Sequence, residues 1–150
     1  GDVYKRQEHH SGQVSFPGGG WEKGDVSLLD TALREAGEEL GIAPERLIVL
    51  GPLTPLYVPP SNNLVHPFVA YTPSRPDFHP DPREVAGLLE VPLQHFQDPH
   101  VRREETRLGP DGLARRVPFF AVGEHKIWGA TAMMLAELLA LLDSPGPQPA

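Results

Sequence analysis

Apolar residues recur at three- and four-residue spacing in two stretches of this 150-residue chain, and both stretches predict helices. The first helix should run to about Leu40, because Gly41 can end it and Asp25 or Ser27 can cap its start. Its apolar stripe consists of Leu29, Ala32, Leu33, Ala36 and Leu40. The second stretch, residues 132–142, is the longest apolar run and is interrupted by Glu137. We predict a core helix here, which buries Met133, Met134, Leu135, Leu138 and Leu142.

Shorter apolar segments predict strands, and proline and glycine mark the connections between them. The alternation of residues 13–16 is typical of a half-buried strand that Pro17 ends. Residues 104–122 indicate a hairpin that turns at residues 109–112. The other predicted elements are strands at 47–53, 65–71 and 117–122, a short helix at 92–96, a stiff loop at 55–63 and a proline-rich surface connection at 72–83. This irregular alternation favours an α/β fold, with a mixed β-sheet between helices.

The length is that of one domain, which can bury roughly 70% of the surface of the unfolded chain. We expect this domain at residues 11–142. Residues 1–10 include no clear apolar pattern, and we interpret them as an N-terminal remnant that is not native. Residues 143–150 are rich in proline, and we predict a disordered tail.

Composition excludes several kinds of function. The formal net charge of −7 argues against a nucleic-acid surface, which needs clustered Lys and Arg. The chain has no cysteine, which excludes disulfides, zinc–thiolate sites and thiol nucleophiles. No apolar run reaches the length of a membrane span. We expect a cytoplasmic monomer or homodimer that binds neither nucleic acid nor membrane.

Three carboxylates fall in one arc of the first helix, beside its apolar stripe: Glu35, Glu38 and Glu39. Like charges at this spacing repel, at about 0.2–0.5 kcal/mol per pair. A divalent cation removes that cost, and clustered carboxylate oxygens suit Mg²⁺ or Mn²⁺. The alternative, which spacing alone favours, is an acidic helix face in contact with water.

The segment from Arg34 to Ile42 reads R-E-A-G-E-E-L-G-I, and it resembles the second half of the signature of Nudix hydrolases. In register, Val26 stands where that signature has its first Glu, with Asp25 next to it. Two further stretches, 12–19 and 127–132, are similar to the coenzyme A pyrophosphatase branch of the family. The resemblance covers about residues 11–142, and it implies the Nudix α/β/α sandwich with a mixed sheet.

The resemblance also implies a reaction, the hydrolysis of the pyrophosphate bond of a nucleoside diphosphate derivative. Coenzyme A, giving 3′,5′-ADP and 4′-phosphopantetheine, is the first candidate; ADP-ribose, a dinucleotide, or a non-catalytic ligand sensor are the alternatives. Glu35, Glu38 and Glu39 would hold Mg²⁺ or Mn²⁺, and Arg34 would pair with one of the acids and orient it. Glu84 would serve as a base or further ligand from outside the signature; otherwise it is a surface carboxylate.

Substrate contacts are predicted in three places. Glycines 18 to 20 (Gly18, Gly19 and Gly20) would shape a loop beside the diphosphate. In the loop at 55–63, Tyr57 could stack on a base and Asn62 or Asn63 bond its polar edge, unless this is an ordinary proline-rich turn. An arginine cluster, consisting of Arg102, Arg103, Arg107, Arg115 and Arg116, suits either an extra substrate phosphate or a solvated rim. Glu8 stands where the coenzyme A branch has Arg.

Overall fold

The computed structural model describes residues 13–144, which form two compact units. The first unit contains residues 16–89, and the second contains residues 13–15 and 90–144. The predictions for residues 1–10 and for 145–150 lie outside the described residues. Between residues 13 and 144, no helix is long and apolar enough to cross a membrane.

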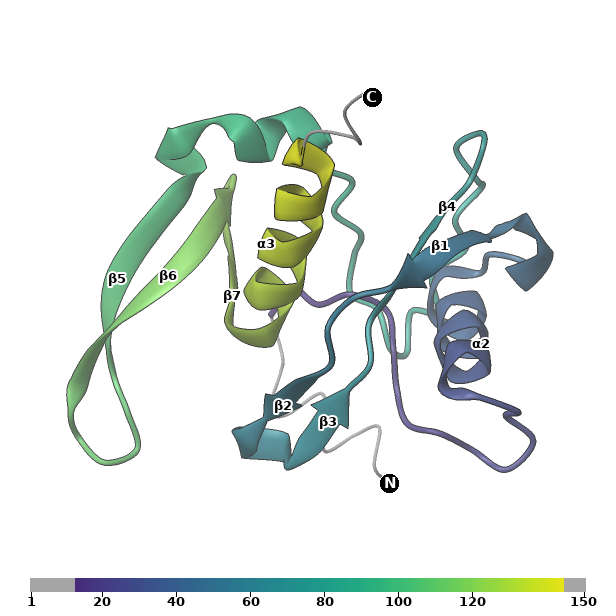
Figure 1. Ribbon diagram of the computed structural model, residues 1–150, viewed down its shortest axis with the longest axis horizontal. Coiled ribbons are helices and arrows are strands. Elements are labelled where there is room, and N and C mark those ends of the chain that lie inside the picture. Colours follow the sequence, from purple (N-terminus) through teal and green to yellow (C-terminus); the bar gives the residue numbers. More distant parts are fainter. Residues whose placement is uncertain (1–12, 145–150) are drawn as a thin grey trace, which may run out of the picture. The chain divides into compact units, whose positions relative to one another are not determined.

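Helix α2 (Leu28–Leu40) and two antiparallel strand pairs make up the first unit (Figure 1). The helix is confirmed with both of its predicted boundaries: Ser27 caps it by accepting from the backbone N–H of Asp30, and Gly41 ends it with φ 70°. The other elements are η1 (Pro44–Arg46), β1 (Ile48–Pro52), β2 (Leu56–Val58), η2 (Pro59–Ser61), β3 (Asn63–Val65) and β4 (Phe68–Tyr71).

The strand pairs of the first unit are β1 with β4 and β2 with β3. The prediction of one strand at 65–71 was wrong, because Pro67, which has no N–H to donate to a ladder, separates β3 from β4. The stiff loop predicted at 55–63 is a hairpin, in which Asn62 adopts the left-handed conformation with φ 52°. Short antiparallel pairing satisfies the backbone here, where composition had suggested an irregular turn.

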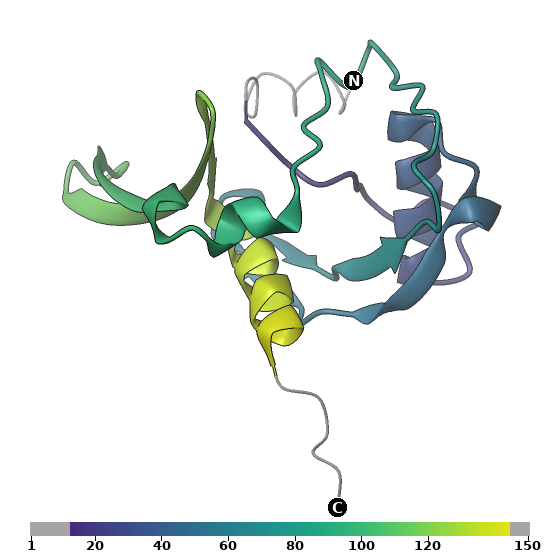
Figure 2. The ribbon, with the colours of Figure 1, turned by 90° about the horizontal axis from the view of Figure 1, so that it is seen from above.

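The second unit contains a three-stranded antiparallel sheet, in the order β5-β6-β7, and helix α3. Figure 2 shows α3 following β7 directly, and the helix packs on β6 and β7. The predicted hairpin is confirmed, with its turn closed by the hydrogen bond from Gly109 N to Leu113 O. The elements are η3 (Leu93–Gln97), η4 (Pro99–Val101), β5 (Arg102–Leu108), β6 (Ala114–Val122), β7 (His125–Trp128) and α3 (Gly129–Asp143).

The core of the second unit joins α3 to the sheet and to the two 3₁₀ helices. Its buried residues are Phe96, Val101, Phe120, Ile127, Ala132, Leu135 and Leu139. Met133 and Leu142, which we predicted to be core, are 63% and 57% exposed. Because α3 buries only one stripe, at positions 132, 135 and 139, apolar residues on its other sides remain in contact with water.

Two further expectations need correction. Residues 13–16 form no strand, because alternation needs a partner to pair with and no described strand pairs with this segment. Val14 instead packs as a partly buried side chain against the core of the second unit. The α/β class is confirmed, but the strand pairs of the described residues are all antiparallel, where we expected a mixed sheet.

Candidate metal and catalytic site

Three carboxylates of the first unit lie close enough to share one cation. One oxygen from each of Glu35, Glu39 and Glu84 lies within 4.8 Å of the others. Glu35 and Glu39 are one helical turn apart on α2, so the helix itself presents them on one side. Glu38 is not part of this group: its Oε2 accepts from Arg34 Nη1 at 3.2 Å, and its side chain is 53% exposed. We call Glu35, Glu39 and Glu84 the carboxylate cluster.

Glu84 reaches the carboxylate cluster because its loop is hydrogen-bonded to the C-terminal end of α2. His79 N donates to Leu40 O at 2.8 Å, and Asp81 N donates to Glu39 O at 3.0 Å. The last carbonyls of a helix have no partner within it, and these two receive theirs from the loop. Asp81 O then accepts from Glu84 N at 3.1 Å. The same bonds that complete the helix end therefore fix the start of the segment that carries Glu84.

The glycine loop lies against the same carboxylates. Gly18 N donates to Glu39 Oε2 at 2.9 Å, and Gly20 O accepts from Arg34 Nη2 at 3.0 Å. A Cβ added to Gly19 would collide with the carboxylate of Glu35. Of the three glycines that the sequence singled out, Gly18 and Gly19 therefore lie against acids of α2 and Gly20 bonds to Arg34. At Gly19 only a residue without a side chain leaves room for that contact.

Gly37, in the middle of α2, costs about 1 kcal/mol of helix stability relative to Ala. Its backbone lies close to the chain that follows the helix, and an added Cβ would be 3.2 Å from Ile42 O. Close packing of the segment after Gly41 therefore accounts for this glycine. The structure records no contact between Gly37 and the carboxylate cluster.

Burial and mutual repulsion make the carboxylate cluster reluctant to carry three charges. Burial, followed by the charges of Glu35 and Glu84, raises the pKa of Glu39 from 4.5 to about 7, although the bond from Gly18 opposes the shift. Burial also raises the pKa of Glu35. A divalent cation would offset both the lost hydration and the repulsion, and carboxylate oxygens are the ligands that Mg²⁺ and Mn²⁺ prefer. The donor set therefore fits a hard divalent cation.

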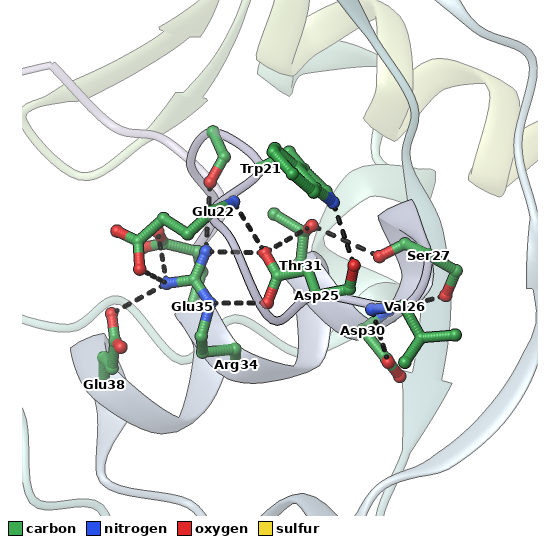
Figure 3. A network of polar contacts seen from close by, with 11 residues as sticks. Trp21, Glu22, Asp25, Val26, Ser27, Asp30, Thr31, Arg34, Glu35 and Glu38 are labelled. Atoms are coloured by element: carbon green, nitrogen blue, oxygen red, sulfur yellow. Dashed lines mark hydrogen bonds and ion pairs between the residues drawn. The ribbon is translucent and has the colours of Figure 1, made fainter.

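A network of polar contacts beside the carboxylate cluster is centred on Arg34 (Figure 3). Asp25 Oδ1 accepts from Arg34 Nε at 3.0 Å, and Asp25 Oδ2 accepts from Nη2 at 3.1 Å. Arg34 Nη1 donates to Glu35 Oε1 at 3.1 Å. The bonds from Arg34 hold the pKa of Asp25 well below its usual range. Sequence reasoning had left Asp25 undecided; its position one residue before the expected acid was the available signal.

The remaining predicted substrate contacts lie elsewhere in the chain. Tyr57 Oη donates to Asn62 Oδ1 at 2.6 Å, and Figure 1 shows their hairpin apart from α2. The arginine cluster of the second unit has partners at each position. Arg107 bonds to Glu105, Arg115 to Asp111, Arg116 to Glu104 and Arg103 to His100 O, while Arg102 lies over the ring of Phe120.

A groove of about 720 Å³ runs along another side of α2. Apolar residues line most of it, and the charged residues Asp25, Asp30, Arg34 and Glu38 also contribute. None of the carboxylate cluster lines it. The groove therefore does not include the carboxylates that would hold a cation against a diphosphate.

Comparison with known proteins adds an independent finding. A family model described as the NUDIX domain matches residues 3–111, a range that includes the glycine loop, α2 and Glu84. A Photorhabdus laumondii protein named "Uncharacterized Nudix hydrolase NudL" is 39% identical over 137 residues, covering 86% of this chain and 68% of that protein. A protein of the same name from Pectobacterium atrosepticum is 38% identical over 143 residues, covering 91% of this chain and 70% of that protein.

Proposed function

Since this chain belongs to the Nudix hydrolase family and is a pyrophosphohydrolase, we propose that its carboxylate cluster holds Mg²⁺ or Mn²⁺ and that the enzyme cleaves a nucleoside diphosphate derivative. The observation that carries the proposal is the approach of three carboxylate oxygens, from Glu35, Glu39 and Glu84, to within 4.8 Å. Two of these residues come from one helix and the third from a loop bonded to its end. An arrangement that crowds like charges in this way favours a site built for a cation.

A divalent cation bound at this site would neutralise charge on the diphosphate and lower the pKa of a water molecule. The residues of the chain supply the rest. A carboxylate oxygen of Glu39 or Glu84 accepts the proton of the attacking water. For Glu39, burial raises the pKa to about 7, and a base works best when its pKa is near the working pH. Arg34 holds the carboxylate of Glu35 through Nη1. Glu38, which bonds to Arg34 at the edge of the site, stays a predicted metal ligand.

Coenzyme A is the substrate we propose first. This choice is supported by the likeness of residues 12–19 and 127–132 to the coenzyme A branch of the family. It is not supported by a pocket for the 3′-phosphate of coenzyme A. Four of the five arginines proposed for that phosphate already bond to an acid or to a backbone oxygen, so binding there would have to displace those partners. The fifth, Arg102, lies over the ring of Phe120. ADP-ribose and dinucleotides share the same diphosphate and are the alternatives. A ligand sensor is disfavoured, since a pure binder need not keep three mutually repelling carboxylates. Val26, at the position of the signature's first Glu, is the feature that favours it.

The test is a substrate panel assayed with Mg²⁺ and with Mn²⁺, with products separated by chromatography. It should contain coenzyme A, dephospho-coenzyme A, ADP-ribose and a diadenosine polyphosphate. Release of 3′,5′-ADP and 4′-phosphopantetheine from coenzyme A, at the highest kcat/KM of the panel, is the expected result. Turnover of another member alone would replace coenzyme A and keep the pyrophosphohydrolase chemistry. Binding without turnover of any member would favour the sensor.

A further inference from the structure

Among the carboxylates that contact Arg34, that of Asp25 is the least exposed. Its side chain is 7% exposed, compared with 13% for Glu35 and 53% for Glu38. Besides the two bonds from Arg34, it accepts from Thr31 Oγ1 and from Glu22 N, both at 2.9 Å. Oδ1 accepts one of these four bonds and Oδ2 accepts the other three, so both oxygens already bond to groups of the chain. Asp25 is not among the carboxylates that approach one another in the carboxylate cluster, and Arg34 is the residue that connects it to Glu35.

Arg34 connects Asp25 to the carboxylate of Glu35 and to the glycine loop. Its guanidinium is planar, so fixing Nε and Nη2 against one carboxylate also fixes the direction of Nη1. Nη1 donates to Glu35 Oε1 at 3.1 Å, and Nη2 donates to Gly20 O at 3.0 Å. The two-point bond to Asp25 therefore sets where Arg34 meets the carboxylate of Glu35 and the glycine loop (Figure 3).

The turn before α2 determines which residue faces Arg34. Asp25 N donates to Glu22 O, and Trp21 Nε1 donates to Asp25 O, both at 3.0 Å. These bonds direct the Asp25 side chain inward. Val26 points the other way: it is 90% exposed, and its N–H donates to Asp30 Oδ2 at 3.2 Å. An acid at position 26 would lie in water at the start of the helix.

We propose that Asp25 is the positioning residue of this site, holding Arg34 so that it orients Glu35 and the glycine loop, in place of an acid at position 26. This inference rests on the proposed function, because Glu35 is taken there as a metal ligand. It assigns a role to a residue outside the carboxylate cluster. It also explains how the chain keeps an oriented Arg34 although Val26 occupies the position of the expected acid.

The first experiment compares Asp25→Asn with Asp30→Asn, a matched change at an exposed acid of the same helix start. In Asp25→Asn, an amide NH₂ faces a donor of Arg34 and the two-point bond is lost. We expect Mn²⁺ affinity of the metal-free protein, measured by electron paramagnetic resonance, to fall about 10–100-fold, with a similar fall in kcat. KM should change by a smaller factor than kcat, because the bond from Gly18 N to Glu39 still holds one end of the glycine loop. Asp30→Asn should match the wild type in each measurement.

A second set of variants tests the route of the effect. Arg34→Lys keeps the charge but cannot form a two-point bond, so it should cause a loss similar to that in Asp25→Asn. The double variant should lose little more than either single one, because both changes break one connection. Arg34→Lys also carries the test if thermal melting shows that Asp25→Asn does not fold. Adding Val26→Glu to Asp25→Asn should restore neither Mn²⁺ affinity nor kcat.

Three results would overturn the inference: wild-type Mn²⁺ affinity and kcat in folded Asp25→Asn or in Arg34→Lys, additive losses in the double variant, or recovery through Val26→Glu. Failure of the proposed function looks different. In that case the wild-type protein itself would bind no Mn²⁺ and would turn over no member of the substrate panel. The two failures can therefore be distinguished before any variant is made.

Discussion

Glu39→Gln should stabilise the metal-free protein at pH 8 while it abolishes most of the activity. The physical reason is that the folded protein holds this carboxyl half-buried near Glu35 and Glu84, which raises its pKa from 4.5 to about 7. The folded state therefore binds the Glu39 proton more tightly than the unfolded chain does. Its contribution to stability is fully present below about pH 4.5 and is lost as the pH rises through 7.

The size of the effect follows from the shift. Each pKa unit corresponds to about 1.4 kcal/mol, so the shift from 4.5 to about 7 corresponds to roughly 3 kcal/mol at pH 8. Solvent screening around a half-buried group reduces this to about 2–3 kcal/mol. Gln resembles the protonated acid and can still accept from Gly18 N. For a chain of this length, the gain corresponds to a rise in Tm of roughly 4–12 °C.

The assay is thermal or urea unfolding of wild type and variant in chelator, at pH 5 and at pH 8. The two proteins should differ clearly at pH 8 and much less at pH 5, which lies just above the pKa of 4.5 that the carboxyl has in the unfolded chain. Glu38→Gln is the matched control: because Glu38 is 53% exposed, its removal should change stability by about 1 kcal/mol or less. Saturating Mn²⁺ at pH 8 should reverse the order, since it binds the wild type more tightly. Equal stability of wild type and Glu39→Gln at pH 8 would refute the reasoning.

Further outcomes are expected. Activity should vanish in excess chelator and return with Mg²⁺ or Mn²⁺; full turnover in chelator would contradict a metal mechanism. Glu39→Gln should lower kcat by at least about a hundredfold, and near-normal kcat would leave the acidic helix face without a catalytic role. Gly19→Ala must displace the Glu35 carboxylate, so kcat should fall at least about tenfold, whereas Gly87→Ala, with nothing within 4 Å of its added Cβ, should not change it. Equal kcat in Gly19→Ala and Gly87→Ala would mean that catalysis does not depend on a fixed position of Glu35. We expect a high KM for coenzyme A, because the arginine cluster is already paired; a preference for dephospho-coenzyme A would exclude the 3′-phosphate from recognition.

The sequence by itself determined the elements whose geometry is local. Helix α2, its Ser27 cap and its Gly41 end follow from a 3.6-residue period and short-range hydrogen bonds. The β5–β6 hairpin follows in the same way from its turn residues. The closeness of Glu35 and Glu39 needed only the helix. The family signature was likewise visible as a run of consecutive residues.

Only the tertiary structure decided which other side chains join that helix. Glu84 belongs to the carboxylate cluster because a distant loop bonds to the last carbonyls of α2, and no local pattern encodes such a bond. Asp25, and not residue 26, faces Arg34 because the turn before the helix directs the two side chains oppositely. Glu38 shares the helical arc of its neighbours, yet it bonds to Arg34 and is not part of the carboxylate cluster. Helical spacing fixes the direction of each Cβ, whereas the partners of a charged side chain depend on groups that folding brings from elsewhere.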